Sequence, residues 1–411
     1  MIETKKGIAV FVYEKKVNSN TFSEDVAELK SLCSSAGIDV MHVVTQSREA
    51  IDPKYYIGSG KVQEIAEMVK SDDIDIVVFN NSLSGSKINN LMQSVNTQVI
   101  DRCMLILDIF ATRAQSREGK LQVELAQLKY SMPRLNMYAN ASNRYGGGVG
   151  MRGPGETKLE TSKRVVEKNI DKLEQELKIL KQRRDLNRQN RQKNRKPVVA
   201  IVGYTNSGKS TLLNTITKAN VYARDQLFAT LDTTTREVWL GGGKSVLLTD
   251  TVGFVSNLPH EFIEAFASTL DECVYADLLL HVVDISNPNH DMQARVTLDT
   301  LHKIGANAKV VTVYNKIDKL DVEKEKVDAC EKTKNIDLIQ QWEIEGLNAS
   351  SDTEVNKCAK NDLLKPKYVC KNNECVYISA SKNIGIDRLK EVIIQYFKNY
   401  FKFFKKVVTK N

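Results

Sequence analysis

The stretch that decides the fold is Val198-Val-Ala-Ile-Val-Gly-Tyr-Thr-Asn-Ser-Gly-Lys-Ser-Thr211. Its apolar first half has the composition of a buried β-strand and ends at Gly203. After four intervening residues come Gly208, Lys209 and Ser210. This is the pattern G-x-x-x-x-G-K-[ST] between a strand and a helix, known as the P-loop. The glycines let several backbone N–H groups point at one spot, and the following helix adds its positive end. The stretch therefore predicts a site for a di- or triphosphate.

Three side chains are expected to serve the phosphates and a magnesium ion. Lys209 should reach the β- and γ-phosphates, and Ser210 should ligate Mg²⁺. Downstream, residues 228–236 offer several hydroxyls, and we expect Thr230 to complete the Mg²⁺ shell and to sense the γ-phosphate. The competing choices are Thr233, Thr234 and Thr235.

A second phosphate-sensing segment is predicted at the end of a strand over residues 244–249. Asp250 should hold Mg²⁺ through a water, and the N–H of Gly253 should meet the γ-phosphate, because only a glycine backbone can approach so closely. Phe254 stands where Ras-like proteins carry a water-orienting glutamine, so intrinsic hydrolysis should be slow and should need outside help. Asn206 is a candidate ligand for K⁺, which would replace an arginine finger.

The base is expected to be guanine. A strand over residues 309–314 ends in Asn315-Lys-Ile-Asp318. The carboxylate of Asp318 can accept hydrogen bonds from both N1–H and N2–H₂ of guanine, a donor pair that adenine lacks. The aliphatic part of Lys316 should lie along the base plane. Ser379-Ala-Ser381 follows the last predicted strand and should close over the guanine.

Residues 198–400 thus read as a P-loop GTPase domain with a mostly parallel sheet and helices on both faces. It carries a Lys/Asn-rich insertion at 320–372 and is followed by a short tail at 401–411. No residue is assigned as a catalytic acid or base. The predicted GTP-binding residues are Gly203, Tyr204, Thr205, Asn206, Ser207, Gly208, Lys209, Ser210, Thr211, Phe228, Ala229, Thr230, Leu231, Asp232, Asp250, Thr251, Val252, Gly253, Asn315, Lys316, Ile317, Asp318, Ser379, Ala380 and Ser381.

The region before the P-loop domain has two predicted parts. Residues 1–112 alternate strand-like and helix-like segments, which predicts a small α/β domain with a largely parallel sheet. Inside it, residues 56–61 (Tyr-Ile-Gly-Ser-Gly-Lys) read as a structural strand-to-helix turn, with phosphate binding as the alternative. Residues 113–197 read as a long antiparallel helical hairpin, with a glycine-rich tip loop at 145–156. Its second helix carries an apolar stripe at three- and four-residue steps, formed by Val166, Ile170, Leu173, Leu177 and Leu180.

Charge singles out the predicted hairpin. The 411 residues have a net charge of +8, and residues 113–197 hold 21 Lys/Arg against 9 Asp/Glu, a surplus of 12 that leaves −4 for the rest. Such a segment indicates a polyanionic partner, and a solvated helix face with ion pairs is the alternative. No apolar run approaches the ~20 residues that span a bilayer, so we expect no transmembrane segment.

Several stretches together resemble the HflX family of ribosome-associated GTPases. They are residues 56–62, residues 107–127, the loop at 146–160 with its Arg-Gly-Pro-Gly-Glu, residues 228–236, and Leu-Pro-His-Glu at 258–261. The resemblance implies binding to the large ribosomal subunit and its RNA, controlled by GTP. It also implies a role in splitting or rescuing stalled ribosomes, or in subunit biogenesis. The basic hairpin would then lie on ribosomal RNA, with residues 146–156 toward the peptidyl transferase centre.

Departures from the family pattern are few. Thr233 stands where the family usually has proline, and Met151 where threonine is usual. We expect no counterpart of the extra C-terminal domain that some relatives carry. The chain starts straight into strand-like residues 8–12, so we expect no signal peptide. A monomeric cytoplasmic protein is expected, with a Phe/Lys-rich tail that could touch a membrane surface.

Two other readings stay open on the sequence. The first is an ATP-dependent RNA remodeller or chaperone that works through the N-terminal half, with the GTPase domain as its regulator. Residues 58–61 are its only support. The second is a GTPase that serves a non-ribosomal protein or membrane partner, which predicts no salt-sensitive RNA binding.

Overall fold

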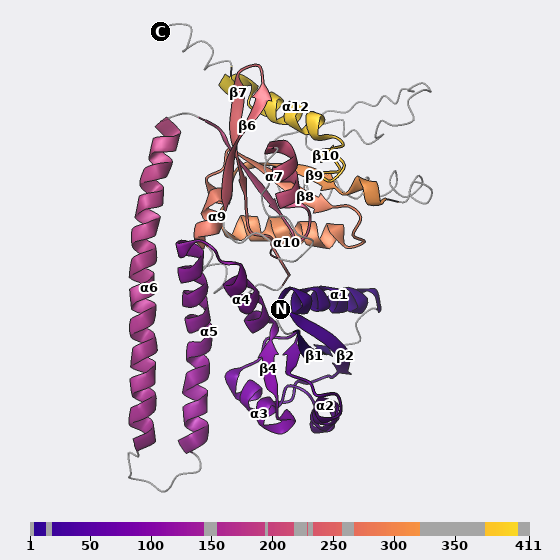
Figure 1. Cartoon of the computed structure of the whole chain (residues 1–411), viewed down its shortest axis with the longest axis vertical. Helices are drawn as coiled ribbons and strands as arrows, with labels where there is room; N and C mark the ends of the chain where they lie inside the picture. Colours follow the sequence, from indigo (N-terminus) through magenta and orange to yellow (C-terminus); the bar gives the residue numbers. More distant parts are fainter. Residues whose placement is uncertain are drawn as a thin grey trace, which may run out of the picture.

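A computed structural model describes residues 4–13, 19–143, 154–193, 196–217, 228, 233–256, 267–320 and 375–401. Figure 1 shows two α/β halves, one above the other, with a long helical hairpin beside them. The hairpin runs alongside the N-terminal half, and its second helix continues up to the C-terminal half.

The N-terminal half is the small α/β domain with a parallel sheet that the sequence predicts. Its strands lie in the order β2-β1-β3-β4, and all three pairings are parallel. Parallel strands need crossover connections, and three helices supply them. The elements are β1 (Lys5–Tyr13), α1 (Ser19–Ser35), β2 (Ile38–Ser47), α2 (Ser59–Asp72), β3 (Ile76–Phe79), α3 (Gly85–Val95) and β4 (Gln98–Asp101).

One helix here has no counterpart in the sequence analysis. Helix α4 (Arg102–Arg113) is apolar around most of its circumference, so it shows no stripe by which to find it. It follows β4 directly, and Asp101 caps it by accepting a hydrogen bond from the backbone N–H of Met104 at 2.9 Å. Helix α4 packs against α1 and α5, which explains why nearly every face of it is buried.

The helical hairpin consists of α5 (Arg117–Asn143) and α6 (Pro154–Lys193). Leu173 of the predicted stripe is 6% exposed at their seam. Ion pairs cross it as well, from Lys129 to Glu174 at 2.7 Å and from Arg184 to Glu118 at 2.7 Å.

The ends of the hairpin helices differ from the prediction. The sequence predicts the first hairpin helix over residues 117–132, but α5 continues to Asn143. The tip loop was expected over 145–156, but α6 already begins at Pro154. Proline suits the first position of a helix, because its φ is pre-set and its missing N–H is not needed there. The rest of the tip, residues 144–153, lies outside the described residues.

The C-terminal half is the predicted P-loop domain. Its six strands lie in the order β10-β9-β8-β5-β7-β6, and only the pairing of β6 with β7 is antiparallel. Helices lie on both faces of the sheet (Figure 1). The elements are β5 (Val198–Gly203), α7 (Lys209–Thr217), β6 (Thr234–Gly241), β7 (Lys244–Asp250), α9 (Ala267–Val274), β8 (Leu278–Asp284), α10 (His290–Lys303), β9 (Lys309–Asn315), a 3₁₀ turn (Ile317–Lys319), β10 (Cys375–Tyr377) and α12 (Ile386–Tyr396).

Strand β9 is less buried than the central strands β5 and β8, and part of the C-terminal half lies outside the described residues. The apolar run at residues 309–314 predicts a buried strand, but the residues of β9 alternate between buried and partly exposed positions, so only one of its faces is fully covered. Most of the predicted insertion, residues 321–374, lies outside the described residues, as do the tail residues 402–411.

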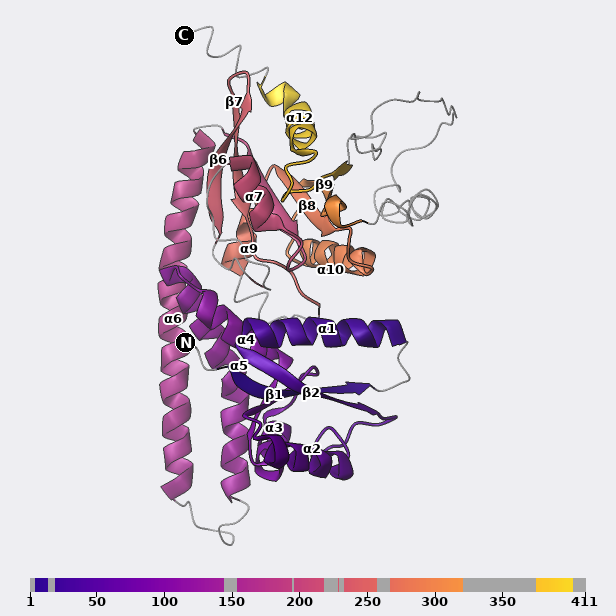
Figure 2. The same cartoon turned by 45° about the vertical axis from the view of Figure 1, so that its right-hand side comes forward.

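The two halves share one apolar cluster. It contains Phe110 of α4 together with Tyr204, Phe228, Val252 and Val255 of the C-terminal half. The rings of Phe110 and Phe228 meet edge to face, with centroids 4.6 Å apart. Figures 1 and 2 both show α1 lying between the N-terminal sheet and α10. Among the described helices, none combines the length and the apolar character that a bilayer crossing needs.

A buried carboxylate joins the hairpin to the N-terminal sheet. Asp101 is fully buried and accepts hydrogen bonds from the backbone N–H of Leu83 at 3.1 Å and from the hydroxyl of Tyr130 at 2.5 Å. Tyr130→Phe should therefore lower the free energy of unfolding by about 1–3 kcal/mol, because it removes a bond to a buried charged group. Urea unfolding followed by circular dichroism measures this. Tyr55→Phe, at a half-exposed hydroxyl, is the control and should cost less; equal costs would contradict the role of Asp101.

Candidate nucleotide-binding site

The predicted nucleotide motifs come together at one edge of the six-stranded sheet. Strands β5, β7, β9 and β10 are parallel and end at Gly203, Asp250, Asn315 and Tyr377. Ligands of open α/β sheets bind beyond the carboxyl ends of such strands. The motif residues that follow β5, β7, β9 and β10 therefore share one location.

The P-loop turns so tightly that two positions require glycine. A Cβ on Gly203 would lie 2.3 Å from the carbonyl oxygen of Val282. Gly208 has φ +92°, and a Cβ there would lie 2.3 Å from Nδ2 of Asn315. Between them, Asn206 adopts a left-handed φ of +62° and is exposed. The turn is therefore pressed against β8 on one side and against the base-reading motif on the other.

Lys209 begins helix α7 and is only 6% exposed. Its Nζ donates hydrogen bonds to the carbonyl oxygens of Tyr204 at 2.7 Å and Gly203 at 3.1 Å. The pKa of Lys209 is lowered to about 8, mainly by burial; Asp250 opposes this shift and nearby Lys316 adds to it. A buried cation at the start of a helix makes this spot strongly attractive to an anion.

Two oxygen ligands for a hard cation meet beside Lys209. The hydroxyl of Ser210 donates to Oδ2 of Asp250 at 2.6 Å, and Asp250 is fully buried. The buried hydroxyls of Thr205 and Ser207 have no hydrogen-bond partner among the described residues. Mg²⁺ usually takes one or two protein oxygens and fills its shell with phosphate oxygens and waters. The hydroxyl of Ser210 and the carboxylate of Asp250 fit this requirement.

The segment after β7 lies directly on the P-loop. Thr205 donates its backbone N–H to the carbonyl of Phe254 at 2.7 Å, and Phe254 donates its own to Gly203 at 3.1 Å. A Cβ on Gly253 would lie 3.0 Å from Nζ of Lys209. The side chain of Phe254 is 2% exposed and packs in an apolar cluster with Cys273, so it is shielded from solvent. Thr251 donates to the carbonyl of Ile201 at 2.7 Å.

The base-reading motif is bonded to the P-loop. Asn315 is 2% exposed, donates from Nδ2 to the carbonyl of Ser207 at 2.9 Å and accepts from the N–H of Ala380 at 3.0 Å. Asp318 is exposed, and its carboxylate accepts hydrogen bonds from Ser379 at 2.5 Å and Ser381 at 3.5 Å. The P-loop, the base-reading motif at residues 315–318 and the segment at residues 379–381 are thus joined by hydrogen bonds into one unit.

Sequence reasoning missed one residue of this unit, Asp284. It ends β8 and forms an ion pair with Lys316 at 2.7 Å, in which both side chains are largely buried. Nζ of Lys316 also donates to the carbonyl of Asn206 at 2.8 Å. These contacts fix the direction of the Lys316 side chain. The apolar run at residues 278–284 predicts a buried strand, and the acidic residue at its end was the available signal.

Four predicted site residues, Ala229, Thr230, Leu231 and Asp232, lie outside the described residues. Phe228 is described and is 2% exposed, packed against Phe110. Its side chain therefore belongs to the contact between the two halves of the chain.

The second glycine-lysine turn, far from the P-loop, has different surroundings. Gly58 donates its N–H to Oε1 of Gln46 at 2.9 Å, and Nζ of Lys61 pairs with Glu64 at 2.6 Å. The N–H of Gly58 and the Nζ of Lys61 therefore already have side-chain partners. At the P-loop, by comparison, Nζ of Lys209 bonds two backbone carbonyls.

Crowding at Gly208 yields a stability test. Gly208→Ala should lower the free energy of unfolding by about 2–4 kcal/mol. The new methyl group collides with Asn315, which is buried and makes two hydrogen bonds through its side chain. Gly242→Ala is the matched control, because its φ is +61° but nothing lies within 4 Å of the added Cβ. At Gly242 the loss should be about 1–2 kcal/mol, because only the left-handed backbone conformation disfavours alanine there. Equal losses in thermal unfolding would contradict the clash.

Three family models match consecutive parts of the chain. The model described as GTP-binding GTPase N-terminal matches residues 23–111, and the GTP-binding GTPase Middle Region matches residues 113–191. The model described as 50S ribosome-binding GTPase matches residues 198–316. Among solved structures, a complex of SsGBP with GDP aligns over 96% of this chain and 99% of its own, with a TM-score of 0.52 and 24% identity. That likeness supports the fold.

Curated relatives match over most of the chain. GTPase HflX of Caldanaerobacter subterraneus subsp. tengcongensis is 43% identical over 92% of this chain and 78% of its own length. GTPase HflX of Escherichia coli (strain K12) is 45% identical over 76% of this chain and 73% of its own length. Both alignments cover more than two thirds of the relative. The chain therefore belongs to the HflX family of GTPases, which bind GTP and hydrolyse it to GDP and phosphate.

Proposed function

We propose that this chain is a GTP-controlled factor of the large ribosomal subunit that splits or rescues stalled ribosomes, with subunit biogenesis as the second setting. The observation that carries the ribosomal part is a row of exposed cations on a long rigid helix, attached to a GTPase domain. The family model over residues 198–316 is described as a 50S ribosome-binding GTPase, which supports the same partner.

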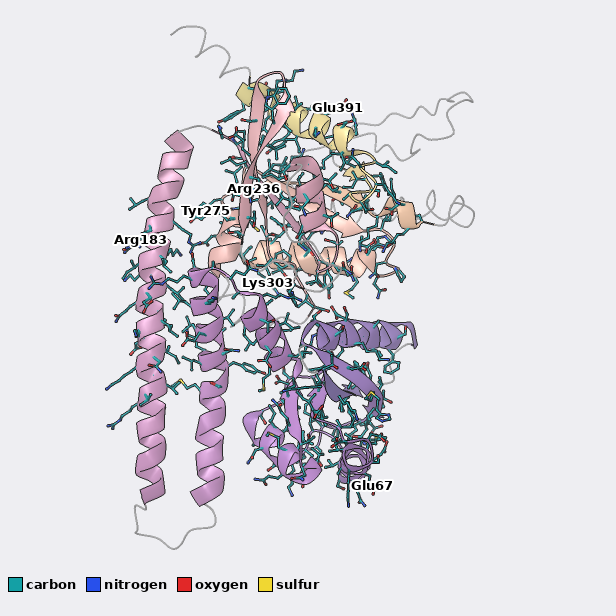
Figure 3. All side chains as sticks on the ribbon, viewed as in Figure 1. Glu67, Arg183, Arg236, Tyr275, Lys303 and Glu391 are labelled. Carbon is teal, nitrogen blue, oxygen red and sulfur yellow. The ribbon has the colours of Figure 1, made fainter. Side chains whose placement is uncertain are left out.

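Helix α6 supplies the surface for ribosomal RNA. Arg183, labelled on α6 in Figure 3, is exposed. RNA presents a dense row of phosphates, and each cation that neutralises one contributes to a salt-dependent affinity. Among the residues of α6 whose burial is described, the exposed cations are Arg164, Lys168, Lys172, Lys178, Lys181 and Arg183.

The hairpin also has the reach that a ribosomal site demands. Helix α6 has 40 residues, which corresponds to about 60 Å at the rise of an α-helix. Its ion pairs with α5 hold it straight against its neighbour. A rigid arm of this length can carry its tip into the interior of a large particle while the nucleotide domain stays at the surface.

At the nucleotide, each predicted residue receives its proposed role from the contacts around it. Lys209 would exchange its two carbonyl partners for phosphate oxygens, and Gly253 would offer its N–H to the γ-phosphate. Ser210 and Asp250 would hold Mg²⁺, which withdraws charge from the phosphates during transfer. Asp318 would exchange its serine partners for the guanine edge. Asn206 is exposed beside the turn and remains our candidate K⁺ ligand.

An ATP-dependent activity of the N-terminal half receives less support. It rests on residues 58–61, where the N–H of Gly58 and the Nζ of Lys61 both have protein partners. A phosphate that used either of these groups would have to displace its present partner.

Co-pelleting with purified large ribosomal subunits through sucrose tests the proposal. Wild type should pellet with a non-hydrolysable GTP analogue and much less with GDP. Asp318→Asn should lose this difference, since an amide cannot accept both guanine hydrogen bonds. Asp299→Asn, at an exposed acid of α10, is the matched control and should keep it. Pelleting should fall as salt rises, since it depends on phosphate contacts. No pelleting in either nucleotide state would remove the ribosome from the proposal and leave the GTPase activity intact.

The lowered pKa of Lys209, about 8, makes GDP binding depend on pH. Phosphates favour the charged lysine, so its pKa rises on binding and the complex takes up a proton. Affinity should therefore be flat well below pH 8 and weaken as pH rises above it. Calorimetry at pH 8.5, in buffers of different ionisation enthalpy, should show uptake of more than half a proton.

Lys209→Arg is the control for this titration, because an arginine stays charged throughout the range. Its proton uptake at pH 8.5 should be close to zero. An identical pH profile for wild type and Lys209→Arg would show that another group titrates.

A further inference from the structure

Four polar side chains join the two halves of the chain beside the P-loop. Glu28 of α1 accepts hydrogen bonds from the hydroxyls of Tyr204 and Ser256, the latter at 3.0 Å. Arg102 of α4 donates to Glu28 at 2.9 Å and to the carbonyl of Ser256 at 3.4 Å. The backbone N–H of Ser256 donates to the Tyr204 hydroxyl at 2.8 Å. We call Glu28, Arg102, Tyr204 and Ser256 the interdomain clamp.

The clamp is built from groups that are costly to separate. Arg102 is 4% exposed and Tyr204 is 5% exposed, and the side chain of Glu28 is 18% exposed. Asn80 supports it by accepting a further hydrogen bond from Arg102 at 2.8 Å. Breaking one member away from a buried charged network leaves its partners without compensation, so the clamp opens only against a competing interaction.

The two members of the clamp in the C-terminal half, Tyr204 and Ser256, belong to segments that are expected to contact the nucleotide. Tyr204 follows the first P-loop glycine, and Ser256 lies three residues after Gly253. An apolar contact runs parallel to it, because Phe228 packs on Phe110 of α4. The N-terminal half therefore holds described residues of the P-loop and of both segments expected to sense the γ-phosphate.

The clamped position leaves little space for a γ-phosphate. Gly253 lies against the P-loop, with its added Cβ 2.9 Å from Cγ2 of Thr205 and 3.0 Å from Nζ of Lys209. A phosphate oxygen needs about 2.7–3.2 Å to each donor that it bonds. Because an atom built on Gly253 would already press on Thr205, a γ-phosphate is accommodated most easily when the segment that carries Gly253 shifts away from the P-loop. Ser256, three residues further on, would shift with it.

We propose that Glu28 and Arg102 are positioning residues of the GTPase reaction. Through Tyr204 and Ser256 they hold the segment from Asp250 to Ser256 against the P-loop. The clamp thereby favours GDP over GTP, and binding of the γ-phosphate is linked to loosening of α1 and α4 from the nucleotide domain. The inference rests on the proposed roles of Lys209 and Gly253.

Affinities of the full chain for fluorescent GDP and for a fluorescent non-hydrolysable GTP analogue test this. Tyr204→Phe removes only the bridging hydroxyl, and Glu28→Gln removes the charge that the clamp shares. Each should lower the ratio of the analogue Kd to the GDP Kd by about 3–10-fold, the worth of one or two hydrogen bonds. The double variant should change the ratio no more than the larger single change, because both act through one network.

Tyr130→Phe is the matched control, since it also removes a tyrosine hydroxyl from a buried carboxylate but lies away from the clamp. Its ratio should equal that of wild type. An unchanged ratio in Tyr204→Phe and Glu28→Gln, or an equal fall in both affinities, would overturn the clamp as a positioning device. If Lys209→Ala binds GDP and the analogue as tightly as wild type does, the phosphate site on which the inference rests is itself overturned.

Discussion

The constraint on which the nucleotide domain depends is the crowding around the P-loop. The backbone at Gly203 and Gly208 comes so close to Val282 and Asn315 that no side chain fits between them. This closeness lets Asn315 bond the carbonyl of Ser207, so that the loop for the phosphates and the motif for the base are held by the same contacts. Once the loop is fixed, four parallel strands present their ends to one ligand.

The chain presents positive charge at two separate places and in two ways. At the P-loop there is a single buried cation, Lys209, and burial is the main cause that lowers its pKa to about 8. Along α6 many exposed cations are spread over a long helix, where each is worth little alone and the sum depends on salt. The first arrangement suits a single nucleotide and the second suits a polymer. The clamp at Glu28 joins the half of the chain that carries the hairpin to the half that binds the nucleotide.

Sequence reasoning found the P-loop, the parallel sheets and the hairpin, because each leaves a local signal of glycine spacing, apolar runs or helical stripes. It missed α4, since a helix buried on most faces has no stripe, and it started α6 late, since Pro154 reads as a breaker although it opens the helix. It also missed Asp284, Glu28 and Arg102. Their partners are 32, 176 and 74 residues away in the chain, and such pairs depend on tertiary packing that leaves no local signal. The pair of Glu28 with Tyr204 depends in addition on how the two halves of the chain meet.

The central claim is that one guanine-nucleotide site, centred on Lys209, serves the whole chain. The most direct test is the stoichiometry of GDP and ATP binding to wild type and to Lys209→Ala, by equilibrium dialysis. The account predicts one GDP per wild-type chain, none for Lys209→Ala, and no ATP bound by either protein. ATP that binds equally to both proteins would contradict it and would point to the glycine turn at residues 58–61.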